Sequence, residues 1–418
     1  MFFGPWCAKL ETLIECKFHS VREEGRLKIL SVNNTSDLYG ASRCMERLFR
    51  QFVLAGHEVH AVLPGTGPLV ALLRSSGVQV HIQPGISIVD RARMRTAWGV
   101  VSFAVSTPLS VLRLAWLIGR LRIDVVHTNT VVMPTPAFAA YLMGVPHVWH
   151  VREILSEFEA FWRPFQHVVT GLSNSVIAVS QSVRQQFLPG LQHQVTVIYD
   201  GLGDEAATVN EAYRTALRER FCADALLVGV VGRIKFHRKG QEILVQAVSL
   251  LKGKYPEARF LVVGSPPPRS PDELGRLSAL MEECGVRERF TLLGEIDDPA
   301  SLFAALDITV VPSVHPEPFG CVVIEAMAVG TPVIGSDCGG IAEQIVDGQT
   351  GLLFKPGDAA ALAIALDRML SDADLRYRMS QQASIRMKTC FRTEDTFLAT
   401  NVMFQYAMGT TSIRNTGS

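Results

Sequence analysis

The first strand-like run of the chain is Leu27-Lys28-Ile29-Leu30-Ser31-Val32, and turn-forming polar residues 33–37 follow it directly. After Gly40, apolar residues recur at helical spacing until Gly56. A second apolar run, Glu58-Val59-His60-Ala61-Val62-Leu63, comes next. Strand, helix and strand in this order are typical of a βαβ unit, whose two strands lie parallel in one sheet. The sequence therefore predicts an α/β fold with loops at the carboxyl ends of parallel strands.

Further short apolar runs fit buried parallel strands and form two series along the chain. The first series continues at residues 78–82, 125–127, 145–148 and 176–179. The second series consists of residues 226–231, 259–263, 290–293, 308–311, 332–334 and 352–354, with helical patterns at 242–251, 299–306 and 359–370. Two series of this length predict two Rossmann-like, doubly wound domains that face each other across a cleft.

The expected boundaries follow from where these series begin and end. Residues 201–224 are mixed and polar, which indicates a linker. The predicted parts are an N-terminal extension (1–26), a first domain (27–200), the linker (201–224), a second domain (225–390), a C-terminal helix that packs back toward the first domain (391–408) and a tail (409–418).

Charge limits the partners of this protein. The 418 residues contain 40 Lys and Arg against 40 Asp and Glu, and this balance argues against a general nucleic-acid binder. Residues 1–200 contain 18 basic and 13 acidic residues, a net of +5, so residues 201–418 carry a net of −5. Because the basic excess is gathered in the first half, the overall balance does not argue against an anionic partner there.

Cysteines and the first residues give weaker indications. The eight cysteines are scattered singly, so the sequence predicts reduced thiols in the cytoplasm and neither a zinc site nor a redox pair. Residues 1–26 carry charges that interrupt any apolar core, so we expect a poorly ordered extension there and not a secretion signal.

A longer uncharged stretch occupies Ala97–Leu112. Its sixteen residues are shorter than the ~20 that a spanning helix needs, so we expect a helix pair inside the domain. Basic residues and aromatic residues interleave between Arg91 and Arg122, a pattern that suits either an anionic membrane surface or ordinary solvated helix faces. We hypothesise that this stretch makes peripheral contact with an anionic membrane.

Two motifs in the second half carry chemistry. Gly232-Arg233 ends a strand and Lys239-Gly240 precedes a helix, so a guanidinium, an ammonium and a helix N-terminus come together as a diphosphate would require. The segment His315-Pro316-Glu317-Pro318-Phe319-Gly320 leads into a helix that contains Glu325. Carboxylates accept hydrogen bonds from paired hydroxyls, which suits a sugar or a ribose, although a glutamate early in a helix is also favoured by the helix dipole.

These motifs, followed by Gly330-Thr331-Pro332-Val333-Ile334 and Gly339-Gly340, resemble the retaining GT-B glycosyltransferases of family 4. The resemblance implies that Arg233 and Lys239 bind the donor diphosphate. It implies that Glu317, Phe319 and Gly320 contact the donor sugar and that Glu325 contacts the nucleotide ribose. His150 and Glu317 are then the expected catalytic residues, and the family's N-terminal glycine loop places Gly40 near the phosphates.

The chain departs from the family pattern at two places. Tyr39 stands where the commoner form has the first of two glycines, so phosphate contact there rests on Gly40. The more usual His-Asp pair becomes His150-Val151-Arg152-Glu153, which leaves the roles of Arg152 and Glu153 open. His127, at another strand end, is a weaker candidate for lining the site.

The expected activity is transfer of a sugar from a nucleotide-diphosphate sugar to a saccharide or lipid-linked acceptor, in the cytoplasm or at the inner face of its membrane. The resemblance implies retention by front-face attack, with no metal and no cofactor beyond the donor substrate. A non-hydrolysing sugar-nucleotide epimerase and a catalytically silent nucleotide-sugar-binding protein remain the alternatives.

Overall fold

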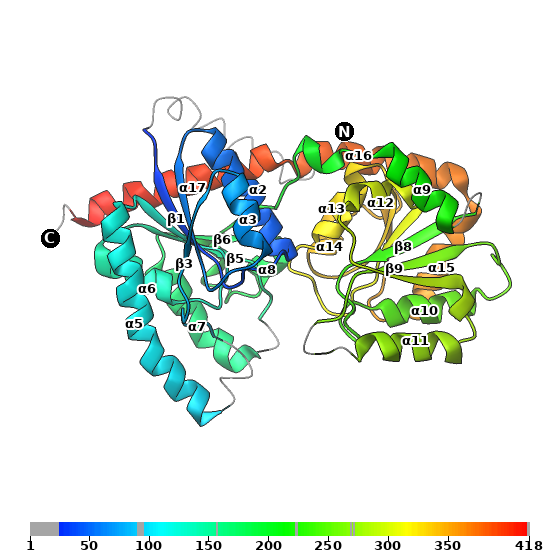
Figure 1. The fold of residues 1–418 in the computed structure, drawn as a ribbon, viewed down its shortest axis with the longest axis horizontal. Coiled ribbons are helices and arrows are strands. Elements are labelled where there is room, and N and C mark those ends of the chain that lie inside the picture. Colours follow the sequence, from blue (N-terminus) through cyan, green and yellow to red (C-terminus); the bar gives the residue numbers. More distant parts are fainter. Residues whose placement is uncertain are drawn as a thin grey trace. The chain divides into compact units, whose positions relative to one another are not determined.

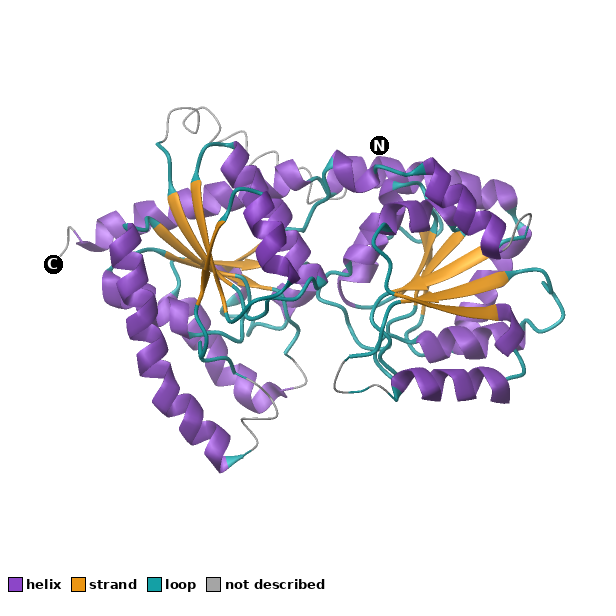
Figure 2. Ribbon diagram, in the orientation of Figure 1, coloured by secondary structure: helices purple, strands orange, loops and turns teal. Residues whose placement is uncertain are grey.

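The computed structural model describes residues 25–89, 96–155, 158–221, 225–267, 270 and 272–415, without the side chains of 100 and 411–415. The chain forms two compact units. Unit 1 comprises Met1–Gly201 with Thr393–Ser418, and unit 2 comprises Leu202–Arg392. Each unit is a parallel sheet with helices packed on its faces (Figures 1 and 2).

Unit 1 contains a seven-stranded parallel sheet in the order β3-β2-β1-β4-β5-β6-β7. Its strands are β1 (Lys28–Val32), β2 (Glu58–Leu63), β3 (Gln79–Ile82), β4 (Val125–Thr128), β5 (His147–Val151), β6 (Ser175–Ala178) and β7 (Val195–Val197). Its helices are α2 (Gly40–Leu54), α3 (Pro68–Ser75), α5 (Ala97–Leu121), α6 (Thr135–Met143), α7 (Glu159–Leu172), α8 (Gln181–Gln185), η3 (Gln192–Gln194) and α17 (Thr393–Asn415).

Apolar side chains fill both faces of the first sheet. Phe49 and Phe52 of α2 are fully buried on one face, where Phe404 of α17 stacks on Phe52. Leu114 and Ile118 of α5 pack on the other face with residues of α6. The C-terminal helix α17 is therefore part of the core of unit 1, as the expected packing of residues 391–408 requires.

Unit 2 contains a six-stranded parallel sheet in the order β10-β9-β8-β11-β12-β13. Its strands are β8 (Leu227–Val231), β9 (Arg259–Val263), β10 (Phe290–Gly294), β11 (Ile308–Val311), β12 (Val333–Ser336) and β13 (Gly351–Phe354). Its helices are η4 (Asp204–Ala207), α9 (Glu211–Phe221), α10 (Gln241–Leu250), α11 (Glu273–Glu283), η5 (Arg287–Arg289), α12 (Pro299–Ala305), α13 (Cys321–Ala328), α14 (Gly339–Gln344), α15 (Ala359–Ser371) and α16 (Ala373–Cys390).

Each sheet has one position where the strand order reverses direction. In unit 1 this switch point lies between β1 and β4, and in unit 2 it lies between β8 and β11. Connections leave such a pair of strands toward opposite faces of the sheet, which opens a crevice beyond their carboxyl ends where ligands bind. The residues that follow β1, β4, β8 and β11 are therefore the first place to look for function.

The structure differs from the sequence-based expectation in two elements. Residues predicted to be a linker contain η4 and α9, which belong to unit 2, because α9 packs against α12. The helix pair predicted over Ala97–Leu112 is wrong: α5 runs as one helix from Ala97 to Leu121 with Pro108 inside it. The helix stays continuous because residues on both sides of Pro108 contact the same domain. Ser106 lies before the proline, and Ser110 and Leu114 lie after it.

Candidate functional site

The turn after β8 is shaped by close backbone packing. Gly232 follows the strand with φ of 142°, and its amide donates to the carbonyl of Val263 at the end of β9. A Cβ on Gly264 would lie 2.1 Å from the carbonyl oxygen of Gly232, so only glycine fits there. Arg233 follows directly, and Gln241 at the start of α10 donates to its carbonyl oxygen. The predicted Arg233 thus stands at the switch point of unit 2.

Lys239 reaches the same place from the loop before α10. Gly240 follows it with φ of 71°, and a Cβ there would lie 1.8 Å from the carbonyl oxygen of Pro312, the first residue after β11. This contact fixes the start of α10 against the end of β11. The two strands that border the switch point are β8 and β11. Arg233 follows the end of β8, and Lys239 lies beside the end of β11.

Glu317 lies opposite Lys239. Its Oε1 is 2.8 Å from Lys239 Nζ and accepts a hydrogen bond of 2.9 Å from the Ser313 hydroxyl. Burial alone raises the pKa of Glu317, but the charge of Lys239 and the hydrogen bonds from Lys239 and Ser313 outweigh it, and the pKa is lowered. The glutamate is therefore ionised near neutral pH, with its second oxygen available to accept further hydrogen bonds.

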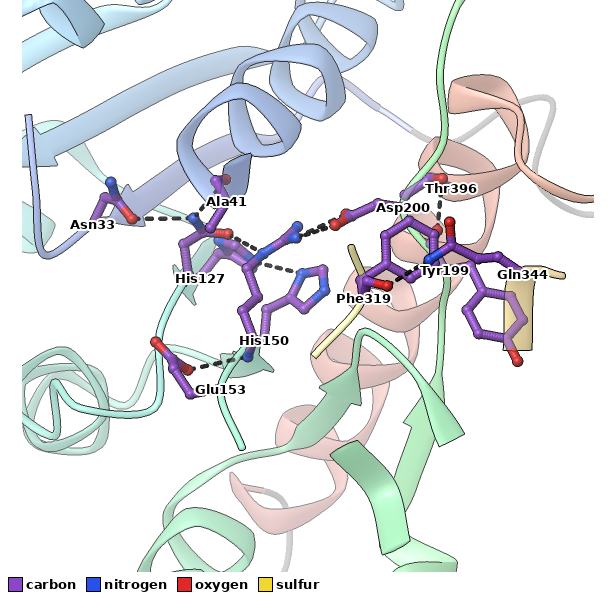
Figure 3. Close-up of polar contacts among 12 residues, drawn as sticks. Asn33, Ala41, His127, His150, Glu153, Tyr199, Asp200, Phe319, Gln344 and Thr396 are labelled. Atoms are coloured by element: carbon purple, nitrogen blue, oxygen red, sulfur yellow. Dashed lines mark hydrogen bonds and ion pairs between the residues drawn. The ribbon is translucent and has the colours of Figure 1, made fainter. Parts of the chain in front are cut away.

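The double glycine after β12 packs on the backbone of this glutamate. The amide of Gly340 donates to the Glu317 carbonyl at 2.8 Å. A Cβ on Gly339 would lie 2.3 Å from that carbonyl oxygen, and one on Gly340 would lie 2.5 Å from the Phe319 Cα. The side-chain amide of Gln344 donates to the Phe319 carbonyl (Figure 3). The absence of side chains at both glycines therefore lets the start of α14 pack directly on the backbone of the 317–319 loop.

The remaining predicted donor-site residues lie on or before α13. Phe319 is buried, and Gly320 caps α13 with φ of 90°. Glu325 is the fifth residue of α13 and is half-buried. Glu317, Phe319 and Gly320 thus form one loop, whereas Glu325 stands one helical turn further along the chain.

In unit 1, polar side chains link the carboxyl ends of three strands (Figure 3). Arg152, just after β5, donates from Nε to Asn129 Oδ1 at 2.8 Å. Asn129, just after β4, donates to Asn33 Oδ1, just after β1, at 3.1 Å. The same arginine places Nη1 2.6 and 2.8 Å from the carboxylate oxygens of Asp200. Arg152 therefore connects Asn129, at the switch point of unit 1, to Asp200.

His150 lies in β5 and is fully buried. Its Nδ1 is 3.4 Å from Nε2 of His127, whose own Nδ1 is 2.9 Å from the Ser31 hydroxyl. Burial, and then the charge of Arg152, hold the pKa of both histidines well below the ordinary value. Both rings are therefore neutral at pH 7, and Nε2 of His150 has no hydrogen-bond partner among the described residues.

Glu153 shapes the loop after β4. Its carboxylate accepts from the Thr130 hydroxyl, from the Val131 amide at 2.9 Å and from the Arg152 amide at 3.1 Å. Burial raises the pKa of Glu153 despite these bonds. Its position indicates a structural role, which the sequence had left open.

Gly40 is the first residue of α2 and is exposed. No side chain of the described residues caps this helix at Tyr39, and a Cβ on Gly40 would meet nothing within 4 Å. The fold itself therefore does not demand glycine here. The exposed start of a 15-residue helix suits an anionic group, as the sequence predicts.

Sequence reasoning did not identify Ser313, Gln344, Asn33, Asn129 or Asp200. Ser313, Asn33, Asn129 and Asp200 each follow a strand, whereas Gln344 is the last residue of α14, so a list of polar residues after predicted strands would have included most of them. Of the basic and aromatic residues between Arg91 and Arg122, Arg91, Arg93 and Arg95 lie outside the described residues.

Comparison with known proteins covers both units. The family model for glycosyl transferases group 1 matches residues 218–386, and the model for glycosyltransferase family 4 matches residues 39–205. The D-inositol 3-phosphate glycosyltransferase of Stackebrandtia nassauensis is 30% identical over 341 residues, which are 75% of this chain and 74% of the relative. The phosphatidyl-myo-inositol mannosyltransferase of Mycolicibacterium smegmatis is 29% identical over 346 residues, 80% and 81% of the two chains.

Solved structures share the two-sheet fold. HepE of Anabaena, in complex with UDP and glucose, superposes with a TM-score of 0.77 at 23% identity, over 91% of this chain and 100% of that chain. Sucrose-phosphate synthase from Thermosynechococcus elongatus superposes with a TM-score of 0.72 at 22% identity, over 92% and 100%. At these identities the likeness establishes the architecture, which is that of GT-B glycosyltransferases.

Proposed function

This chain belongs to the GT-B glycosyltransferases of family 4, and from that membership we propose that it transfers a sugar from a nucleotide-diphosphate sugar to a saccharide or lipid-linked saccharide, with retention at the anomeric carbon. The observation that carries the proposal is the Lys239–Glu317 pair at the switch point of unit 2. A cation for a diphosphate and a carboxylate for sugar hydroxyls are held there side by side.

The donor-binding roles follow from chemistry and position. Arg233 and Lys239 bind the diphosphate, Glu317 and the backbone at Phe319 and Gly320 bind the sugar, and Glu325 binds the ribose. HepE, whose solved complexes contain UDP, glucose or UDP-glucose, supports a nucleotide-sugar donor for this chain as well. In unit 1, a phosphate-binding role is proposed for Gly40, at the exposed start of α2.

Catalysis depends on stabilising the leaving diphosphate. Breaking the anomeric bond develops negative charge on the phosphate oxygens, and Arg233 and Lys239 stabilise that charge as it forms. These cations supply the positive charge that a metal ion would otherwise provide, so we expect activity without one. The acceptor attacks from the face that the diphosphate leaves, and the departing phosphate assists its deprotonation. The catalytic role proposed for His150, whose ring is neutral at pH 7, is that of a hydrogen-bonding group through Nε2.

The acceptor belongs to the more basic unit 1. A saccharide built on a lipid phosphate would meet this charge favourably, which suits assembly of cell-surface polysaccharide at the cytoplasmic face of a membrane. The phosphatidyl-myo-inositol mannosyltransferase relative, with its lipid acceptor named, supports this class of acceptor.

The test begins with thermal shifts in UDP-glucose, UDP-N-acetylglucosamine and GDP-mannose, because a ligand that binds the native state raises the melting temperature. We expect one of them to stabilise the wild type and not Glu317→Ala. Release of nucleoside diphosphate is then measured with and without lipid-linked saccharides, in the presence of EDTA. Acceptor-dependent release supports transfer. Conversion of the sugar without any acceptor would replace the proposal with an epimerase, and binding without turnover would indicate a silent binding protein.

A further inference from the structure

Helix α5 presents an apolar face to solvent. Trp98, Val105 and Trp116 are 79%, 72% and 59% exposed, although large apolar side chains usually turn inward. They belong to a set of large apolar residues, each more than half exposed, that recurs every three or four positions and so follows one side of the helix: Trp98, Val101, Val105, Leu109, Leu112 and Trp116. We call this side, with its extension on α6, the apolar face.

The opposite side of α5 is polar in its first half. The hydroxyl of Ser106 lies 2.8 Å from that of Ser87, and the hydroxyl of Ser110 donates to the Gly85 carbonyl and accepts from the Ser87 amide. A helix on a protein surface in water normally turns its apolar residues inward and its polar residues outward. This part of α5 has the reverse arrangement, which indicates that its outer face meets something other than water.

Helix α6 continues the apolar face. It packs against α5, with the Met143 Cε 3.1 Å from where a Cβ of Gly119 would stand. Tyr141 and Leu142 of α6 are exposed as well. The two neighbouring helices are labelled in Figure 1. Exposed contiguous apolar area of this kind on a folded protein marks an interaction surface.

The charges on the apolar face are all positive. The sequences of α5 and α6 contain Arg113 and Arg120 and no acidic residue. The guanidinium of Arg120 lies 4.9 Å from the ring centre of the exposed Trp116. Arginine beside tryptophan at the edge of an apolar surface suits the boundary between lipid headgroups and acyl chains.

We propose that the apolar face of α5 and α6 docks on an anionic lipid surface, with its apolar side chains among the acyl chains and Arg113 and Arg120 at the headgroup phosphates. A two-fold contact between two copies through this face would bring α5 against α5 and place arginines near arginines with no acid on either helix to compensate. An anionic lipid surface offers acyl chains to the apolar side chains and negative headgroups to the two arginines.

The helix lies on the surface and does not cross it. Among the described residues, α5 is the one helix long and apolar enough to span a membrane by length and composition. Its inner side, however, is committed to the domain, since Leu114, Leu117 and Ile118 belong to the core against the first sheet. Membrane docking would bring the protein to a lipid-linked acceptor, so this inference rests on the proposed function.

The experiment is co-sedimentation of the full chain with vesicles. One set contains phosphatidylcholine alone, and the other contains equal parts of phosphatidylcholine and phosphatidylglycerol, each at low and high salt. We expect binding to the anionic vesicles, weaker at high salt. Arg113→Glu/Arg120→Glu should lower the partition coefficient at least about tenfold, and Leu109→Ser/Trp116→Ser should lower it comparably. Ile364→Ser/Tyr377→Ser, which changes two exposed apolar residues of unit 2, is the matched control and should bind like the wild type.

Each outcome decides the proposal. Absence of wild-type binding to anionic vesicles, or equal binding by the α5 variants, would overturn it. Concentration-dependent dimers in sedimentation velocity that Leu109→Ser/Trp116→Ser abolishes, without vesicle binding, would assign the face to a second copy. Thermal shifts with the nucleotide sugars are measured on the same samples. They confirm that the variants are folded, and they separate failure of membrane docking from failure of the proposed donor binding.

Discussion

Lys239 Nζ lies 2.8 Å from Glu317 Oε1, so the cation assigned to the donor diphosphate and the carboxylate assigned to the donor sugar hold each other. Each neutralises the other where both are largely removed from water, with side chains 34% and 14% exposed. Binding of a donor would exchange this contact for two others, cation to phosphate and carboxylate to hydroxyl, without leaving either charge alone. The pair thus keeps the donor site charged and ordered before a ligand arrives.

Replacing Lys239 by alanine should weaken donor binding by about 10- to 100-fold, the value of a hydrogen bond to a charged group. The same change removes the main opposing charge from Glu317, so the pKa of that glutamate should rise. Isothermal titration with the nucleotide sugar selected by thermal shift measures the affinity. Lys388→Ala, a change of an exposed lysine on α16, is the control, and equal affinities for the two variants would refute the assignment.

Gly340→Ala tests whether the double glycine acts by shape. The added Cβ would lie 2.5 Å from the Cα and 2.6 Å from the carbonyl oxygen of Phe319, so the 317–319 loop has to move. We expect donor affinity to fall at least about tenfold, because a displaced loop weakens the hydrogen bonds assigned to Glu317 and to the backbone at Phe319, each worth about 0.5–1.5 kcal/mol. Gly190→Ala adds a methyl that meets nothing within 4 Å and should leave affinity unchanged. A Gly340→Ala protein with wild-type affinity would show that the loop adapts.

The sequence predicted the strands of both sheets well because buried parallel strands are short apolar runs between turn residues. It missed β7, whose three residues Val195–Val197 are too few to form a pattern. The Pro108 in α5 wrongly suggested two helices, because only tertiary contacts show that both sides are held to one domain. The linker prediction failed to detect α9 since that helix buries a single residue, Leu217, and so has almost no apolar stripe.

The candidate site divides in the same way. Motif residues such as Arg233, Lys239 and Glu317 could be predicted because their types and spacing are linked to a known chemistry. Asp200 could not, because its importance depends on Arg152, which lies 48 residues earlier and reaches it only in the folded chain. Long-range hydrogen bonds between single polar side chains leave no periodic signal in a sequence.

Breaking the Arg152–Asp200 pair should destabilise unit 1. Both side chains are almost fully buried, 3% and 4% exposed, and Asp200→Asn would leave the guanidinium without its counter-charge. Breaking such a pair typically costs about 3–5 kcal/mol. The melting temperature should therefore fall by several degrees, whereas Asp204→Asn, at an exposed position, should leave it unchanged. Arg152→Met/Asp200→Leu, which removes both charges, should recover much of the loss, and a double variant no better than the single one would argue against the ionic explanation.

Buried neutral histidines should make unit 1 sensitive to mild acid. His147 is fully buried between the Thr128 and Ser173 hydroxyls, and burial lowers its pKa to about 3. Burial is also the first cause that lowers the pKa of His127 and His150. In the unfolded chain all three titrate near pH 6.5, so below that pH the unfolded state binds protons that the folded state does not. The stability that these neutral histidines contribute is fully present above about pH 6.5. It is lost as the pH falls from 6.5 toward their lower pKa values in the folded protein.

Each such histidine should contribute at most about 1.4 kcal/mol per pH unit to this loss, a limit that is approached once the unfolded histidine is protonated. Denaturant unfolding at pH 7.5, 6.5 and 5.5, followed by a probe in unit 1, measures the slope. His147→Gln removes one titrating group, so its stability should be lower at pH 7.5, through two lost hydrogen bonds, but should fall less steeply between pH 6.5 and 5.5. His193→Gln, at an exposed position, is the matched substitution for comparison. If wild type were as stable at pH 5.5 as at 7.5, or if His147→Gln kept the full slope, these rings would not be neutral and buried in solution as the structure has them.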